Sequence, residues 1–470
     1  MKIMKEEKKD SLKLKHKIGY GLGDAGGVMT FALMSSTFSM YCTDALGISP
    51  GTIGILLLIW NVWDFINDPL MGAYIDRSFA KNSSRKGKFR PWILRSAPLL
   101  CVTFIALWSA PSLFAGITRL CVLFILKILY EGAYTMFNIP MGSLLSSMAD
   151  NDEERAALSS ARGVGSAGAT LIALFIMPLF LKKYGESNPT GYAIGASICA
   201  LIGFAMCLGH YALTFERNNT HSNPEEADNI KATDILEVMK VNRPFVALCV
   251  HGLFICTMQY VGNTLNNYMY SDVLGDISIA GYGTLFSAPS MIIIFIAGPI
   301  IARKIGLERL IRYGLLISCI LYVTLFGALM LTSVNPWVYA IWSNTAMGFA
   351  FISIYMQWGL VGEAIDYNEM ITGKRTEGSI YGTFNLSRRV GQTIGNSAAM
   401  LLLGLVGYNG ALAVQAPATI NGIKALCVLL PGILVLGSWA TFKFLWNMDD
   451  EMRARVDEFK AAKKAVSKEE

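Results

Sequence analysis

The sequence predicts an all-α integral membrane protein with twelve transmembrane helices arranged in two six-helix bundles. Three observations lead to this prediction. Of the 470 residues, 53% are hydrophobic and only 16% are charged, whereas soluble chains average about 25% charged residues. Many apolar runs reach the ~20 residues that a helix needs to cross the hydrocarbon core of a bilayer. A long polar interruption, residues 216–244, divides these runs into two sets of six.

The expected spans follow one another along the chain with uncertain ends of about 2–4 residues each. Residues 1–17 are rich in lysine and lead straight into a long helix, so they are expected to form a tail rather than a cleaved signal peptide. In chain order the spans are 18–43, 51–76, 91–110, 116–147, 158–182, 191–214, 244–270, 281–302, 309–331, 337–366, 379–407 and 421–446.

The distribution of lysine and arginine predicts the orientation. These residues crowd the N-terminal tail and alternate loops, and the loops between carry almost none; the exception is the pair Lys182–Lys183. Because basic loops stay on the cytoplasmic side, both termini are expected in the cytoplasm of a plasma (inner) membrane protein. The basic segments run from Arg77 to Arg90, from Arg303 to Arg312 and across Lys374–Arg375.

The two halves of the chain carry a similar connection after their second helix. "GAYIDR" begins at Gly72, and "GPIIARKIG" begins at Gly298. Repeated halves favour a binding site near the midplane between them. The expected organisation is a cytoplasmic tail (1–17), a bundle (18–215), a cytoplasmic central loop (216–243), a second bundle (244–446) and a cytoplasmic C-terminal tail (447–470), which we expect in water or on the membrane surface.

Several function classes find no support in the sequence. The nine cysteines are scattered, with no CxxC pair and no zinc-like spacing, and are expected to be free and buried. No basic, aromatic-interleaved segment indicates nucleic-acid binding. The four histidines are dispersed and no nucleophile motif is present, so neither an enzyme nor a bound cofactor is expected.

Two aspartates, Asp64 and Asp68, lie one helical turn apart in the apolar run "LLLIWNVWDFINDPLMGAYIDR". A carboxylate at mid-bilayer costs about 2.5–3.5 kcal/mol on insertion scales, and two on one helix face repel each other. A shared cation or proton relieves both penalties, and hard cations prefer oxygen ligands. The pattern therefore predicts a cation or proton site, with polar contacts between helices as the alternative.

A polar stripe follows one face of the fourth span, at Lys127, Glu131, Thr135 and Asn138. The i, i+4 spacing of Lys127 and Glu131 favours a neutralising pair within the helix. Thr135 and Asn138 carry the uncharged oxygen and amide groups that an ion or a hydroxylated ligand uses. A hydroxyl bonded back to its own helix is an equal alternative for Thr135.

Asp24 follows Tyr20 by one turn in the glycine-rich segment "GYGLGDAGG". An aspartate beside aromatic residues suits sugar hydroxyls, although a helix-end aspartate is an equal alternative. Arg162 opens the fifth span and the pair Arg388–Arg389 lies in the eleventh. Buried arginines need acids, either from the chain or from the carboxylate of a ligand.

Several ordered motifs resemble the glycoside–pentoside–hexuronide:cation symporters of the major facilitator superfamily, from about residue 17 to about residue 446. The resemblance implies two pseudo-symmetric six-helix bundles that move a sugar and a cation together by alternating access. The motifs are "GYGLGD", "WDFINDPLMG", "YTMFNIPMGSL", "DNDEERAALSSARG" and "EAIDYNEMITGKRTEGSIYGTFNLSRRVGQTIG".

The resemblance also implies roles for individual residues. It assigns cation (metal) binding to Asp64, Asp68 and Thr135, with Na⁺ favoured over H⁺ or Li⁺. The substrate-binding candidates are Tyr20, Asp24, Asn138, Arg162 and Arg389.

Some residues depart from the family pattern. The melibiose-permease type has aspartate at the position of Asn138, tryptophan at that of Gly142 and lysine at that of Arg389. Arginine does not deprotonate usefully, so Arg389 is expected to be a charge partner or carboxylate clamp. The sequence therefore does not specify which sugar is transported.

Charged residues at the cytoplasmic helix ends are expected to form a gate of breakable salt bridges. We expect a functional monomer whose partners are a sugar, a coupling cation and the lipid bilayer. A lipid or lysolipid carrier on the same fold is the alternative function. The gate residues are Asp76, Arg77, Asp150, Arg155, Asp366 and Arg375.

Overall fold

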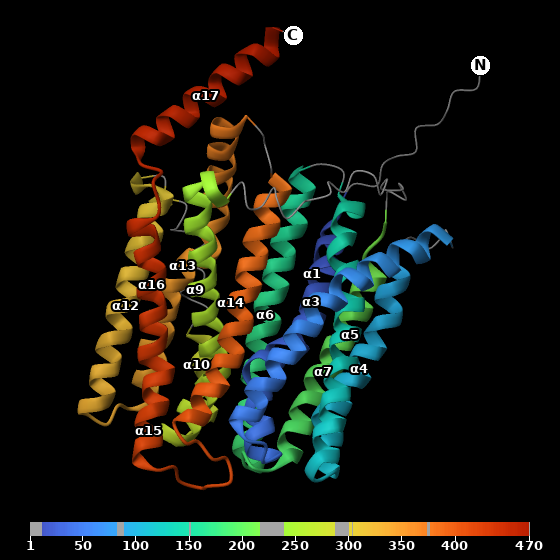
Figure 1. Cartoon of the computed structure of the whole chain (residues 1–470). Helices are drawn as coiled ribbons and strands as arrows, with labels where there is room; N and C mark the ends of the chain where they lie inside the picture. The colour runs from blue at the N-terminus through green and yellow to red at the C-terminus, as the bar shows by residue number, and fades with distance from the viewer. Residues whose placement is uncertain are drawn as a thin grey trace. The chain divides into compact units, whose positions relative to one another are not determined.

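The structure, a computed structural model of the chain, is helical and contains no strand in the residues that it describes (Figure 1). The all-α prediction is confirmed for this part of the chain. The described residues are 12–81, 89–149, 152–216, 239–286, 300–302, 304–373 and 377–469.

The helices group into two compact units. Unit 1 comprises Met1–Met34 and Ile59–His221, and unit 2 comprises Ser35–Leu58 and Ser222–Glu470. The sequence assigned residues 35–58 to the first bundle, whereas their contacts place them with unit 2. In this stretch the end of α1 and the start of α3 pack against helices from the other half of the chain, a grouping that helix periodicity does not reveal.

The described residues of unit 1 form six long helices, which are labelled in Figure 1. Within it α4 packs against both α5 and α7, and α7 packs against α6. The helices are α1 (Leu14–Ser36), α3 (Pro50–Lys81), α4 (Arg90–Ser109), α5 (Gly116–Met148), α6 (Asp152–Tyr184) and α7 (Pro189–Leu213); α1 ends and α3 begins in unit 2.

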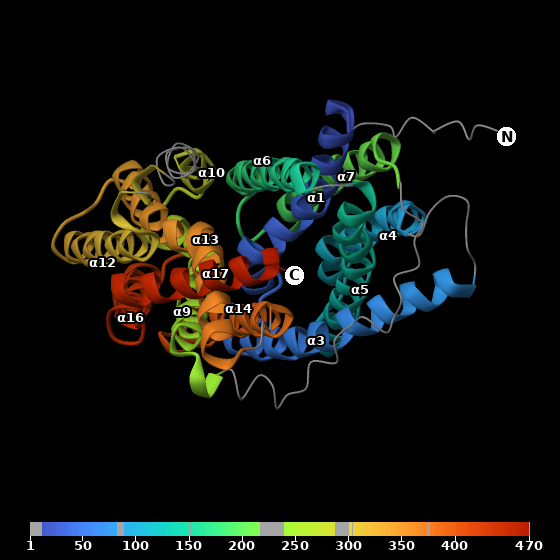
Figure 2. The same cartoon turned by 90° about the horizontal axis from the view of Figure 1, so that it is seen from above.

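Unit 2 centres on α9, which packs against both α14 and α16, as the view from above also shows (Figure 2). Helix α12 packs against α13 and α16. The α-helices in its described residues are α2 (Phe38–Met40), α9 (Arg243–Tyr268), α10 (Ser278–Leu285), α12 (Leu307–Leu331), α13 (Pro336–Thr372), α14 (Glu377–Leu405), α15 (Pro417–Lys424), α16 (Leu430–Phe444) and α17 (Asp450–Glu469).

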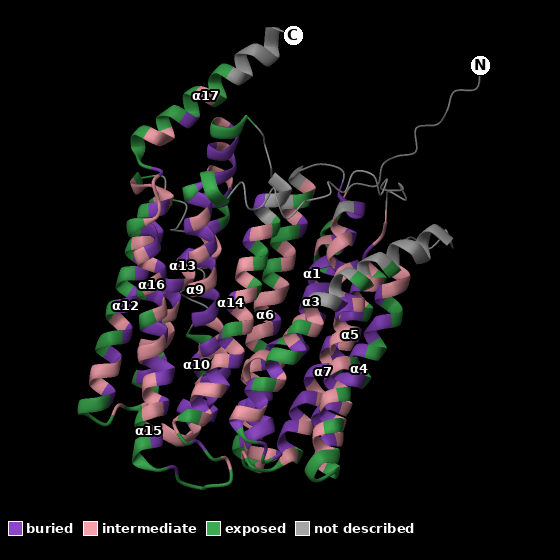
Figure 3. Ribbon diagram, viewed as in Figure 1, coloured by how far each residue is buried: buried purple, intermediate pink, exposed green. Residues whose placement is uncertain are grey.

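Large apolar residues are exposed at helical spacing along α12, a helix on which Figure 3 marks exposed residues in green. Tyr313, Ile317, Ile320 and Val323 recur three or four residues apart, and each is at least 41% exposed. A stripe of this kind faces an apolar environment, because water would not tolerate so much contiguous apolar surface. We conclude that these helix faces contact lipid.

Eight helices in the described part of the chain are long and apolar enough to cross a membrane. Helices α1, α3 and α14 are not among them; they carry Asp24, Asp64 and Arg389. The spans are Arg90–Leu113, Gly116–Leu145, Ala157–Tyr184, Pro189–Leu213, Arg243–Val273, Leu307–Leu331, Pro336–Thr372 and Pro417–Phe444.

Glycines let α1 approach its neighbours in unit 1 very closely. A Cβ atom on Gly21 would lie 2.6 Å from the carbonyl oxygen of Ala161 on α6, and one on Gly26 would lie 2.5 Å from Sγ of Cys207 on α7. A Cβ atom on Gly165 of α6 would overlap the carbonyl oxygen of Gly21. Small residues at such crossings allow close van der Waals packing where lipid offers no hydrophobic driving force.

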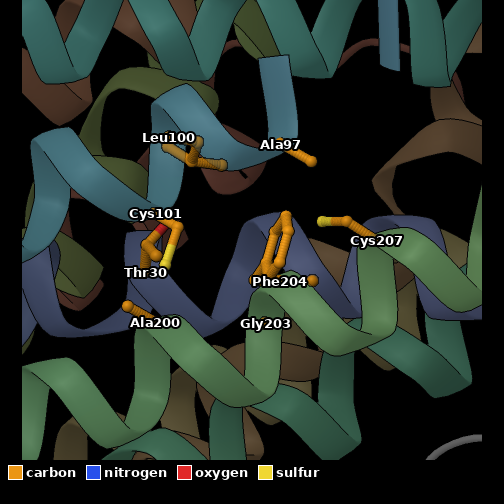
Figure 4. A pocket seen from close by; sticks show the side chains of 9 residues that line it. Thr30, Ala97, Leu100, Cys101, Ala200, Gly203, Phe204 and Cys207 are labelled. Carbon is orange, nitrogen blue, oxygen red and sulfur yellow. The ribbon is translucent and has the colours of Figure 1, made fainter. Parts of the chain in front are cut away.

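Beside the α1–α7 crossing lies a small pocket among α1, α4 and α7 (Figure 4). Its polar groups are the hydroxyl of Thr30 and the thiols of Cys101 and Cys207, and the rest of its lining is small or apolar. A sugar needs several hydrogen-bonding groups around it, so this pocket is poorly suited to one.

Two short π-helices show the internal repeat of the fold. They are η1 (Tyr41–Ala45) and η4 (Met269–Val273), and the related sequences "TDALG" and "SDVLG" run through their ends. Each is followed by a glycine at positive φ, Gly47 at 66° and Gly275 at 73°. π-Helical turns are rare in proteins, and those that occur are often located at functional sites.

We predict that Gly165→Ala destabilises unit 1, because the new methyl group must displace the α1 backbone. Overpacking of this kind costs about 1–3 kcal/mol. Gly163→Ala is the matched control, since a Cβ atom there meets nothing within 4 Å and alanine favours a helix over glycine. Thermal unfolding of the purified protein in detergent should show a lower melting temperature for G165A alone; equal melting of the two variants would contradict this packing.

Candidate functional site

Helices α3 and α5 contact each other at two points within unit 1. The ring of Trp60 stacks on Phe124 at a centroid distance of 6.0 Å, and Nδ2 of Asn67 donates to Oγ1 of Thr135 over 3.0 Å. Asp64 lies one turn after Trp60 and about one turn before Asn67. It is therefore level with the middle of the polar stripe on α5.

The hydroxyl of Tyr130 on α5 is close enough to the Asp64 carboxylate for the two groups to interact electrostatically. That hydroxyl in turn donates to Oγ1 of Thr30 on α1 over 3.3 Å. Three helices of unit 1 therefore contribute polar groups to the layer around Asp64.

The structure describes part of the predicted cation site. Thr135 is buried, at 5% exposure, and its hydroxyl accepts from the residue that precedes Asp68. Asp64 is half-buried. The side chain of Asp68 lies outside the described part of the chain, so the ligand set Asp64, Asp68 and Thr135 remains a prediction. In the described residues no group of three or more His, Cys, Asp or Glu side chains could hold a metal ion.

Lys127 and Glu131 form the intrahelical pair that their spacing predicts: Nζ of Lys127 donates to Oε1 of Glu131. Both side chains are nearly buried, at 9% and 13% exposure. The ammonium group also lies 5.8 Å from the centroid of the Trp60 ring and 5.5 Å from that of Tyr130. Distances of this size allow cation–π attraction.

The structure brings together three of the predicted substrate residues. Nε of Arg162 on α6 donates to Oδ1 of Asp24 on α1 over 3.0 Å, and Asp24 is 8% exposed. Tyr20, one turn before Asp24, is fully buried, and its hydroxyl donates to the carbonyl of Met141 over 3.3 Å. Asn138 lies on α5, about one turn before Met141, and is half-buried.

The acid that Arg162 was predicted to need is therefore Asp24. Because the side chain of Arg162 is still 40% exposed, part of its guanidinium can meet a ligand while Nε holds the aspartate. A buried carboxylate that Nε of an arginine holds in place suits hydrogen bonding to sugar hydroxyls through its remaining lone pairs.

The remaining substrate candidate, Arg389, lies on α14 in unit 2 and is exposed. Its neighbour Arg388 is the more enclosed of the two. The Arg388 guanidinium lies 5.4 Å from the ring centroid of Trp358 on α13, and its stem packs near Gly252 on α9. The sequence favoured Arg389 because it matches the basic position of the family pattern. In the structure it is Arg388 that packs against neighbouring helices.

The predicted gate is described only in part. Arg155 is exposed, and Asp366 accepts from Nζ of Lys460 over 2.7 Å. The side chains of Asp76 and Arg77, and residues Asp150 and Arg375, lie outside the described part of the chain. The gate therefore stays a prediction.

The C-terminal helix α17 lies against α12 and α13, rather than only in water or on the membrane surface as expected. Nε of Arg453 pairs with Oε2 of Glu363 over 3.1 Å, and Arg309 pairs with Asp450 over 2.6 Å. An apolar contact supports the ion pairs, since Val456 joins Met448 and Tyr367 in one buried cluster.

A polar cluster in unit 2 joins the two repeat motifs, and sequence reasoning missed it. The hydroxyl of Tyr408 contacts Oδ1 of Asp44 at 3.0 Å and Oδ2 of Asp272 at 3.3 Å. Thr43 and Tyr268 share a further hydrogen bond of 2.9 Å. The duplicated "TDALG" and "SDVLG" motifs could have indicated these positions, because each contributes one aspartate.

Residue types, burial and fold together define a class of protein. Apolar helices with lipid-facing stripes enclose layers of ionisable and hydroxyl groups in the membrane-spanning region, an arrangement that membrane proteins keep for moving polar solutes. The protein is a multi-pass membrane transporter.

Comparison with known proteins gives the family. The model of the family described as MFS/sugar transport protein matches residues 19–449, and the chain belongs to that family. It is 29% identical over 459 residues to an uncharacterized symporter of Bacillus subtilis (strain 168), with 97% of each chain covered. It is 28% identical over 448 residues to the glucuronide carrier protein homolog of Escherichia coli (strain K12), with 91% of each covered.

A solved structure supports the fold. The nucleoside transporter NupG superposes with a TM-score of 0.61 at 13% identity, over 93% of this chain and all of NupG. At this identity the likeness shows the fold alone. The predicted major facilitator fold, the predicted family and the prediction that the chain is not an enzyme are confirmed.

We predict that Tyr408→Phe loosens the contact of residues 41–49 with the rest of unit 2. Burial and the carboxylates of Asp44 and Asp272 hold the pKa of the Tyr408 hydroxyl well above its ordinary value, so it keeps its proton to donate. Hydrogen bonds to charged groups are worth about 1.5–3 kcal/mol, and local opening should become about tenfold more frequent. Hydrogen exchange of residues 41–49 measures this.

The control for that experiment is Tyr313→Phe, which removes a hydroxyl from a tyrosine that is 51% exposed on α12. Exchange of residues 41–49 should be unchanged in this variant. Equal exchange rates in Y408F and wild type would show that the hydroxyl does not hold the two motifs together.

Proposed function

We propose that the protein is a secondary active symporter that carries a sugar together with a cation by alternating access. Membership of a sugar-transporting family supports this function, as do relatives that are named symporters or a glucuronide carrier homolog. The observation that carries it is the arrangement within unit 1, where a buried Asp24, held by Arg162 and suited to a sugar, occurs with a layer around Asp64 suited to a cation.

The sugar is proposed to bind at Asp24, with Arg162 fixing the carboxylate, Tyr20 lying one turn away and Asn138 contributing an amide. Arg162 holds Oδ1 through Nε, which leaves lone pairs on the carboxylate for sugar hydroxyls. Tyr20 is held by the backbone of α5. The donor set is therefore positioned before the sugar arrives, which reduces the entropy cost of binding.

The coupling cation is proposed to bind Asp64, Asp68 and Thr135, with Na⁺ favoured over H⁺ and Li⁺. Oxygen ligands from two carboxylates and a hydroxyl suit a hard cation. Thr135 lies on α5, which also carries Asn138 and the Met141 carbonyl that accepts the hydrogen bond from Tyr20. Binding of the cation can therefore affect the sugar site through this helix.

An acidic ligand group is the partner that we favour for Arg388 in unit 2. In the described part of the chain the close contacts of Arg388 are an aromatic ring, a thiol and apolar atoms rather than a carboxylate. An arginine in this environment gains from an anionic ligand. We further propose that the protein lies in the plasma membrane with both termini in the cytoplasm. We also propose that it functions as a monomer.

Uptake by purified protein in proteoliposomes tests the function. Labelled glycosides, pentosides and hexuronides are each offered with a Na⁺ gradient, a proton gradient and no gradient. We expect one sugar class to accumulate with one gradient only. Equilibration that no gradient drives would contradict symport, and movement of lipid instead of sugar would favour the lipid-carrier alternative.

We predict that Asp64→Asn and Asp24→Asn separate the two binding events. D64N should lose ion stimulation of transport while it still binds sugar, because a neutral amide cannot balance a cation. D24N should lose at least about 1.5–3 kcal/mol of sugar binding, the value of hydrogen bonds to a charged group, while it still binds the ion.

Each of these variants is the folding control for the other. Sugar binding by D64N and ion binding by D24N are measured by calorimetry on the purified proteins. Cation-stimulated transport by D64N with unchanged stoichiometry would contradict the assignment of Asp64.

A further inference from the structure

The pair Lys127–Glu131 has no role in the sugar or cation sites as described so far. Both side chains are nearly buried within the membrane span Gly116–Leu145. Desolvation offsets much of the attraction between two buried charges, so such a pair is weak evidence for stability. Ionisable residues inside a span usually mark a functional site.

The pair lies next to the layer of the cation site. The Lys127 ammonium group is 5.8 Å from the ring of Trp60, which precedes Asp64 by one helical turn on α3. It is also 5.5 Å from the ring of Tyr130, whose hydroxyl lies within the field of Asp64. The contact with Trp60 thus brings the lysine charge to the side of α3 on which Asp64 follows one turn later.

Glu131 restrains this lysine and lies closer to the site along the helix. It accepts the hydrogen bond from Nζ of Lys127, and it precedes Thr135 by one turn on the same face of α5. Along that face the positive charge of Lys127 comes first, the negative charge of Glu131 second and the proposed cation ligand Thr135 third. Apolar surroundings make such charges act over longer distances than they would in water.

We propose that Lys127 and Glu131 tune the affinity of the cation site for an alkali cation, with Lys127 weakening binding and Glu131 strengthening it. This inference rests on the proposed function. The ammonium group repels an entering cation, whereas the carboxylate attracts it. As a bonded pair the two nearly cancel, and the site then depends on its own ligands.

The opposite signs distinguish this role from a purely structural one. If the pair only holds the helix together, loss of either partner should weaken ion binding by damaging the fold. If it tunes the site, Lys127→Gln leaves an extra negative charge and tightens binding, whereas Glu131→Gln leaves an extra positive charge and weakens it. The double variant should return towards wild type.

The test is titration of purified protein with Na⁺ and with Li⁺, followed by calorimetry without sugar. A unit charge just outside a ligand shell changes cation affinity by roughly tenfold or more at the dielectric constants that describe protein sites. We expect K127Q to bind about tenfold more tightly and E131Q about tenfold more weakly. K183Q and E186Q, which remove charges from the far end of α6 and the loop after it, should bind as wild type does.

Shifts of K127Q and E131Q in the same direction, or no shift in either, would overturn the inference. Wild-type protein that binds neither Na⁺ nor Li⁺ would also overturn it. The proposed function can fail separately, since gradient-driven sugar uptake is scored in its own assay. The double variant buries neither charge, so it would also reverse misfolding that an unpaired charge causes. The opposite directions of the two single variants are therefore what separates tuning from a structural role.

Discussion

The cost of placing charge in an apolar interior is the constraint on which the rest of this structure depends. Helices can cross the membrane because their backbone N–H and C=O groups form hydrogen bonds to one another within the helix. Every ionisable side chain that they carry must still find a partner. Asp24 finds Arg162 on another helix, and Lys127 finds Glu131 on its own. Asp64 and Asp68 lie one turn apart in the sequence, and the cation that we propose there would offset their mutual repulsion.

Close helix packing supplies the geometry that makes these partners effective. Glycines allow α1 to approach α6 at Gly21 and Gly165, and this crossing lies beside the point where Asp24 meets Arg162. A bulkier residue there would separate the two helices and lengthen the ion pair. The same glycines that remove side-chain volume therefore position a charged site, so packing and chemistry in unit 1 are not independent.

Much of the fold could be predicted from the sequence, because apolar length and loop charge are local signals. The Lys127–Glu131 pair followed from i, i+4 spacing alone. The partner of Arg162 did not, since Asp24 is 138 positions away and several acids were available. The docking of α17 and the grouping of residues 35–58 with unit 2 also depend on contacts between distant segments. Local periodicity carries no information about such contacts.

The central claim is that cation and sugar sites are energetically coupled, and calorimetry tests it most directly. Sugar affinity is measured with and without saturating cation, and cation affinity with and without saturating sugar. Linkage requires both affinities to change by the same factor. The account predicts that each ligand tightens the other by this shared factor. Sugar affinity that is the same with and without the cation would contradict it.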